Sequence, residues 1–78
     1  MSVMIEIYYH KPADSQREAL ISKRLADHKG KVTYREDDSG ETICLTAEFT
    51  TWENADAATT AFRAAGEHVE GPSDYSKN

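Results

Sequence analysis

Residues 41–50 read E-T-I-C-L-T-A-E-F-T, and this stretch carries the clearest structural signal in the chain. Every second residue from Ile43 to Phe49 is apolar, and the residues between them are polar or small. Successive side chains of a β-strand point to opposite faces of the sheet. The alternation therefore predicts a strand with one apolar face and one mixed face.

Residues 3–10 read V-M-I-E-I-Y-Y-H and alternate in the same way. The odd-numbered residues from Val3 to Tyr9 are predicted to lie on the apolar face, and the even-numbered residues on the mixed face. Pro12 ends this strand, because proline has no N–H group to donate to a neighbouring strand. Both strands are therefore expected to point their odd-numbered side chains inward.

A strand over residues 31–37 is predicted to form a hairpin with the 41–50 strand, because turn-forming aspartate, serine and glycine residues separate them. Regular alternation places Tyr34 on the apolar face and Arg35 on the mixed face. Residues 68–70 are a candidate for a short fourth strand. The polar, turn-rich sequence that follows them predicts a C-terminal tail.

Ser15 and Glu18 have the spacing of a capping box, in which the serine hydroxyl accepts a helix N–H and the glutamate reaches back to the cap. This spacing predicts a helix from about residue 16 to residue 29. Gly30 suits the left-handed position that follows the end of a helix. The apolar stripe of this helix consists of Ile21, Leu25 and His28, with Leu20 beside it.

Thr50 and Glu53 repeat the spacing of a capping box and predict a second helix over about residues 51–65. Gly66 is placed to end this helix. The apolar stripe contains small residues that allow the helix to approach a sheet closely, with one phenylalanine as the main anchor. The stripe consists of Ala55, Ala58, Phe62 and Ala65.

The predicted element order is βαββα, with the candidate fourth strand at the end. Each strand has one apolar face, so both helices are expected to cover the same face of an antiparallel sheet. This arrangement is the ferredoxin-like, split βαβ plait, an α+β fold of two layers. A different order of the same elements, or a plait without the fourth strand, is the alternative. Residues 1–70 are expected to form one domain and residues 71–78 the tail.

The 78 residues are enough for one domain, and 9 basic against 14 acidic side chains give a net charge of −5. This acidic balance argues against a nucleic-acid-binding surface. The sequence shows no 18-residue apolar run, so we expect no membrane span. We also expect no secretory signal, because no positive segment followed by an apolar one is visible near residue 1. The lone cysteine, Cys44, favours the reducing cytoplasm. The spacing of the histidines predicts no metal site, and we expect no cofactor.

In this topology one face of the sheet has no helix over it, and its side chains mix polar, charged and aromatic types. Such a face is solvated, packs against a second copy in a homodimer, or forms a cleft for a small-molecule ligand. Small domains without disulfides often gain stability by pairing, which favours the homodimer. The residues predicted for this face are Met4, Glu6, Tyr8, His10, Thr33, Arg35, Thr42, Cys44, Thr46 and Glu48.

Tyr8, His10 and Glu48 are the candidates for catalysis on this face. Histidine transfers protons near neutral pH, a carboxylate, either Glu48 or Glu6, would orient it, and Tyr8 would donate to an oxyanion. An ordinary strand-end histidine is the simpler interpretation of His10. Cys44 is a nucleophile only if a cation such as Arg35 lowers its pKa, and is otherwise a small, half-buried residue. The candidates for binding are Tyr8, His10, Arg35, Cys44 and Glu48.

We therefore expect a small cytoplasmic binding domain that self-associates and has no catalytic motif. The alternative is a small-molecule-binding or enzymatic domain of the dimeric α+β barrel type, which would use the same open face. A pocket lined by His10 with a hydrogen-bonded carboxylate would favour the alternative. A flat sheet face would favour self-association.

Overall fold

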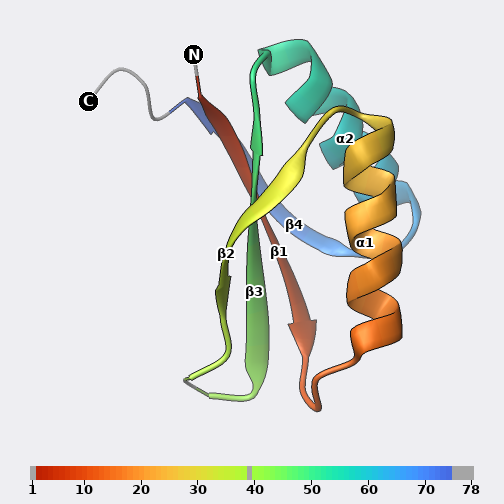
Figure 1. Cartoon of the computed structure of the whole chain (residues 1–78), viewed down its shortest axis with the longest axis vertical. Coiled ribbons are helices and arrows are strands. Elements are labelled where there is room, and N and C mark those ends of the chain that lie inside the picture. The colour runs from red at the N-terminus through yellow and green to blue at the C-terminus, as the bar shows by residue number, and fades with distance from the viewer. Residues whose placement is uncertain (1, 39, 75–78) are drawn as a thin grey trace.

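The computed structural model describes residues 2–38 and 40–74. Over these residues the chain forms one layer of sheet and one layer of helices (Figure 1). In chain order the elements are β1 (Val3–His10), α1 (Ser15–Asp27), β2 (Lys31–Glu36), β3 (Thr42–Phe49), α2 (Trp52–Ala64) and β4 (His68–Asp74).

Neighbouring strands in the sheet are antiparallel, and their order is β2-β3-β1-β4. The α+β class is therefore confirmed, and the strand order is compatible with the expected plait. The candidate fourth strand is present and is longer than residues 68–70, since β4 continues to Asp74. Four residues of the expected tail thus belong to the sheet, and residues 75–78 lie outside the described residues.

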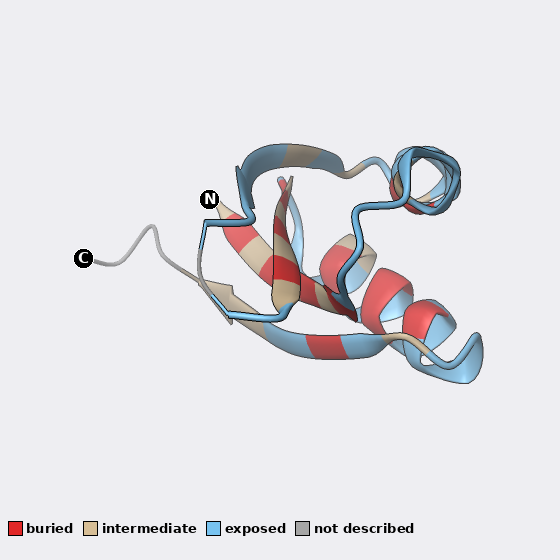
Figure 2. Ribbon diagram, turned by 90° about the horizontal axis from the view of Figure 1, so that it is seen from below, coloured by how far each residue is buried: buried red, intermediate tan, exposed pale blue. Residues whose placement is uncertain are grey.

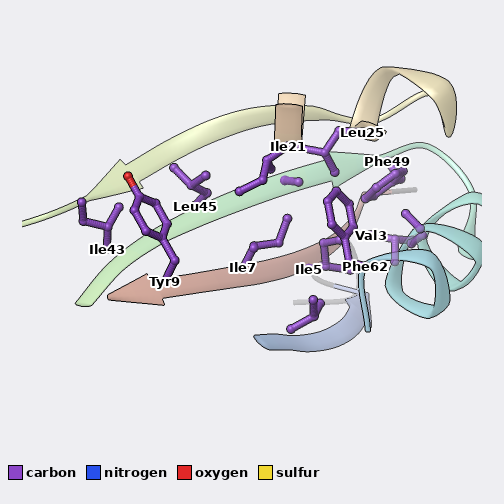
Figure 3. Packing of buried hydrophobic residues seen from close by; sticks show 14 residues of the cluster. Val3, Ile5, Ile7, Tyr9, Ile21, Leu25, Ile43, Leu45, Phe49 and Phe62 are labelled. Atoms are coloured by element: carbon purple, nitrogen blue, oxygen red, sulfur yellow. The ribbon is translucent and has the colours of Figure 1, made fainter. Parts of the chain in front are cut away.

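Both helices lie on the same side of the sheet, as Figures 1 and 2 show. The odd-numbered side chains of β1 and β3 are buried beneath these helices, and the even-numbered ones are half-buried or exposed on the other side. The predicted parity of both strands is thus confirmed. The buried hydrophobic side chains form one cluster (Figure 3), which consists of Val3, Ile5, Ile7, Tyr9, Ile21, Leu25, Ile43, Leu45, Ala47, Phe49, Ala55, Ala58, Phe62 and Val69.

The strand β2 breaks the predicted alternation. Its register with β3 shifts at Thr33, so Tyr34 lies opposite Thr46 on the face away from the helices. Arg35 lies opposite Leu45 on the helix side of the sheet. The predicted faces of Tyr34 and Arg35 are therefore wrong, because one extra residue in a strand turns every later side chain to the opposite face.

The N-caps are Asp14 and Thr51 rather than the predicted Ser15 and Thr50. Each cap side chain accepts the N–H group three residues further on, over 3.0 Å at Asp14 and 3.2 Å at Thr51. Aspartate and threonine are both favoured at this position, so the next residue in each case starts the helix. Glu18 is bound elsewhere, as described below. The helices of the described residues include none that is long and apolar enough to cross a membrane.

Both helices end in the same motif, in which the two residues after the cap donate N–H groups back to the last turn. At the end of α2, Gly66 has a φ of +89°, as its predicted position requires. At the end of α1, Lys29 takes the left-handed conformation with a φ of +64°, so the predicted role of Gly30 is wrong. Gly30 instead packs against the ring of Phe49, which leaves no space for a side chain. His28 and Ala65, expected on the apolar stripes, are the C-cap residues and lie outside the core.

The left-handed Lys29 predicts a stabilising substitution. Lys29→Gly should raise the free energy of unfolding by about 1 kcal/mol, because an L side chain costs roughly 1–2 kcal/mol in this conformation and glycine has no such cost. Urea denaturation at neutral pH measures the change. Lys23→Gly, at an exposed site within α1, should lower stability by about 1 kcal/mol. A Lys29→Gly variant no more stable than the original chain would contradict the prediction.

Candidate functional site

The face of the sheet opposite the helices, here called the open face, is crossed by three complete rows of side chains. Residues paired across neighbouring strands stand side by side on one face, so the strand register defines the rows. From β2 through β3 and β1 to β4, the rows are Glu36-Cys44-Tyr8-His68, Tyr34-Thr46-Glu6-Glu70 and Lys31-Glu48-Met4-Ser73, and the pair His10-Thr42 lies beyond the first row.

A groove of about 500 Å³ lies on the open face, mainly along β1 and β4. In its wall, the Nε2 atom of His68 lies 3.0 Å from a carboxylate oxygen of Glu70. The ring of His68 also meets the ring of Tyr8 edge to face, with 5.3 Å between ring centroids. The groove therefore combines aromatic and carboxylate groups. Its lining residues are Glu6, Tyr8, Tyr9, His10, Thr42, His68 and Glu70.

The groove brings together Tyr8 and His10, which the sequence predicts on this face, with His68 and Glu70, which sequence reasoning missed as site residues. Val69 between them is buried on the helix side, so its two neighbours point to the open face. The alternation of His68, Val69 and Glu70 was the available signal. It became decisive only once these residues were known to pair with β1.

The predicted partnership between Glu48 and His10 is wrong. Glu48 pairs with Met4, six positions along β3 from the partner of His10, which corresponds to about 20 Å of strand. Glu6 lines the groove but lies four positions from His10, or about 13 Å along β1. No hydrogen bond or ion pair within residues 2–38 and 40–74 joins the exposed His10 side chain to a carboxylate, so the geometry assembles no proton-transfer pair at this residue.

Tyr8, Cys44 and Glu6 form a half-buried cluster on the open face. Burial raises the pKa of the Tyr8 phenol well above its ordinary value, and the nearby Cys44 and Glu6 raise it further. Burial also raises the pKa of the Cys44 thiol, whose sulfur lies 3.9 Å from a carboxylate oxygen of Glu6. Both groups therefore stay protonated at neutral pH, and Cys44 is a weak nucleophile.

Arg35 lies on the helix side of the sheet, whereas Cys44 lies on the open face. The prediction that Arg35 lowers the pKa of Cys44 is therefore wrong. Its Nε and Nη2 atoms donate to the two carboxylate oxygens of Glu18 over 2.9 and 3.0 Å, and Nη1 donates to Asp37 over 2.6 Å. The buried Tyr9 hydroxyl also donates to Glu18. These contacts join α1, β1 and β2, so Arg35 has a structural role in the observed fold.

Comparison with models of known protein families and with curated protein sequences gives no match for this chain. Within the part of the chain that the structure describes, no three histidine, cysteine or acidic side chains come together as a metal-binding group. The function is therefore argued from the geometry of the open face.

The raised pKa of Cys44 predicts slow thiol modification. At pH 7 and low protein concentration, Cys44 should react with a disulfide reagent at least about tenfold more slowly than the same thiol in the urea-unfolded chain, because burial protects it and disfavours the thiolate. The absorbance of the released thiolate measures both rates. Rapid, saturating modification of the folded protein would instead identify a reactive cysteine.

The contacts of Glu18 predict sensitivity to acid. The Arg35 guanidinium, with help from the Tyr9 hydroxyl, holds the pKa of Glu18 below its ordinary value. A lowered pKa in the folded protein stabilises the fold at every pH above the pKa of glutamate in the unfolded chain, which is about 4.3. This stabilisation is lost as the pH falls from about 4.3 through the lower pKa of the folded protein. Glu18→Gln should therefore flatten the decline of stability between about pH 6 and about pH 3.

Urea denaturation at several pH values measures this decline. Arg35→Gln should flatten it as well, because the same ion pair is lost. A Glu18→Gln variant that declines as steeply as the original chain would show that Glu18 does not carry the acid sensitivity.

Proposed function

We propose that this chain is a small binding domain that self-associates through the open face. The supporting observation is that the central side chains of this face, such as Met4, Tyr8, Cys44 and Thr46, are half-buried. Within residues 2–38 and 40–74 no helix covers this face, because both helices lie on the other side of the sheet (Figure 2). Tyrosine and methionine side chains lie favourably against a partner because their apolar parts become buried. The ferredoxin-like plait and a cytoplasmic location, which suits a single thiol, complete the proposal.

Pairing of edge strands would be another route to a dimer, but both edges of the sheet oppose it. The edge strand β2 has its bulge at Thr33, between a lysine and an arginine. The edge strand β4 shifts register opposite Ile5, where Gly71 and Pro72 lie. Bulges, charged side chains and proline all hinder the addition of a further strand. The open face is therefore the better contact surface.

The size of the open face sets the expected affinity. Four strands about 4.8 Å apart and about 25 Å long give roughly 500 Å² for each copy, or about 1,000 Å² in total. This total lies at the low end of specific protein interfaces. We therefore propose a weak dimer, with a dissociation constant on the order of micromolar to hundreds of micromolar.

Gel filtration with light scattering, at protein concentrations up to about 1 mM, tests this proposal. The measured mass should rise with concentration toward twice that of one chain. Tyr34→Glu should weaken the rise, because Tyr34 is 61% exposed on the open face. Leu20→Glu, at a residue 58% exposed on α1, should leave it unchanged. A monomer mass at the highest concentration would overturn the proposal.

The groove favours a second candidate function, a small-molecule-binding or enzymatic domain of the dimeric α+β barrel type. Convergent polar groups around Tyr8, His10 and His68 are typical of a ligand site. Chemical-shift mapping against a metabolite library would locate such a ligand. Shifts that cluster at the groove and vanish in His10→Ala would support this function. Shifts that are absent, or that His10→Ala leaves unchanged, would count against it.

A further inference from the structure

The charges of the open face restrict how two copies can meet. The three complete rows contain four glutamates and one lysine, so carboxylates must not face one another across a dimer. Two two-fold axes give full overlap of the faces with aligned strands. One axis runs perpendicular to the strands through the middle row, and the other runs parallel to the strands between β1 and β3.

The perpendicular axis places the middle row of one copy against the same row of the second copy. Glu6 would then face Glu6, and Glu70 would face Glu70. Like charges placed opposite each other are destabilising, and enclosure between two sheets strengthens the repulsion. The register of the strands therefore disfavours this axis.

The parallel axis places each row against the same row of the second copy in reverse order. His68 then faces Glu36 of the second copy, and Cys44 faces Tyr8. In the middle row, Tyr34 faces Glu70 and Thr46 faces Glu6, so a hydroxyl meets each carboxylate. The fourth glutamate of the open face is Glu48. It lies opposite Met4 of the second copy, and Lys31 is its neighbour in its own sheet.

We infer that the second copy completes the groove, by associating about the axis parallel to the strands and placing its Glu36 opposite His68. This inference rests on the proposed self-association. The groove lies along β1 and β4. Association about this axis places β3 of the second copy over β1, and β2 of the second copy over β4. With two sheets about 10 Å apart, side chains from both copies line the enclosed space. The ligand-binding surface is thus built from two chains.

Charge substitutions at exposed edge residues test the inference. His68→Glu should raise the dissociation constant of the dimer about tenfold. The new carboxylate would lie beside Glu70 and opposite Glu36 of the second copy, and the two-fold axis repeats this repulsive contact, so that it occurs twice in each dimer. Adding Glu36→Lys should restore the original value to within about threefold. Sedimentation equilibrium measures the constants, and thermal melting monitors the folding of each variant.

The single variant Glu36→Lys distinguishes the two axes. About the parallel axis it meets His68 and its neighbour Glu70, so the dimer should be at least as tight as the original. About the perpendicular axis Glu36 would face Lys31, and a lysine in its place would weaken the dimer. A dimer that His68→Glu leaves unaffected, or that Glu36→Lys does not restore, would overturn this inference while self-association stands. A chain that is monomeric throughout would overturn both.

Discussion

Replacing Phe62 with alanine is expected to lower the free energy of unfolding by about 3–5 kcal/mol, the largest effect predicted here. The Phe62 side chain is fully buried between α2 and the sheet, among residues such as Val3 and Ile5 (Figure 3). The other buried side chains of α2 are those of Ala55, Ala58 and Thr59, which are too small to fill the space left by the ring. A domain of this size has a total stability of roughly 4–12 kcal/mol, so the variant is expected to be largely unfolded at moderate temperature.

Urea denaturation followed by circular dichroism measures this loss. Leu20→Ala is the matched control, because it also removes a large apolar side chain from a helix but at a site that is 58% exposed. It should change stability by less than about 1 kcal/mol. If the two variants lost similar stability, Phe62 would not be the anchor of α2.

Gly30→Ala is expected to cost about 2–3 kcal/mol, the second largest effect. A Cβ atom at this position would lie far inside van der Waals contact with three ring atoms of Phe49. The ring is 2% exposed and packs within the core, so it cannot swing aside without disturbing its neighbours. The physical reason is therefore a close approach between the loop after α1 and the end of β3.

A double-mutant cycle tests that reason. In a Phe49→Leu background the cost of Gly30→Ala should fall by about 1–2 kcal/mol, because the smaller side chain leaves space for the new methyl group. Gly40→Ala serves as the control, since its φ of +64° costs roughly 1–2 kcal/mol although no atom lies within 4 Å of the added Cβ. A Gly30→Ala variant that loses no more than Gly40→Ala would show that the contact with Phe49 is not the constraint.

The faces of β1 and β3 could be predicted from the sequence because both strands pair with each other without interruption. Each apolar residue from Ile43 to Phe49 then marks the buried side directly. The same reasoning failed in β2, where Val32 and Tyr34 have the spacing of one face but the bulge at Thr33 separates them. A bulge depends on the partner strand, so the residues of β2 alone do not reveal it.

The candidate site was predicted in part for a related reason. Tyr8 and His10 follow from the parity of β1, and both line the groove. His68 and Glu70 come from a strand that contains only one buried apolar residue, Val69, so its pattern was too short to place them. Pairing of β4 with β1 creates the contact between Tyr8 and His68.

By itself the sequence determined the α+β class, the parity of β1 and β3 and most of the buried residues of both helices, because the periods of strand and helix are properties of the local backbone. Only the tertiary structure decided that Arg35 meets Glu18 and that Tyr8 meets His68. Both contacts join segments that are distant in the chain. Their existence depends on a bulge and on a strand register, and these are set by the packing of whole strands against one another.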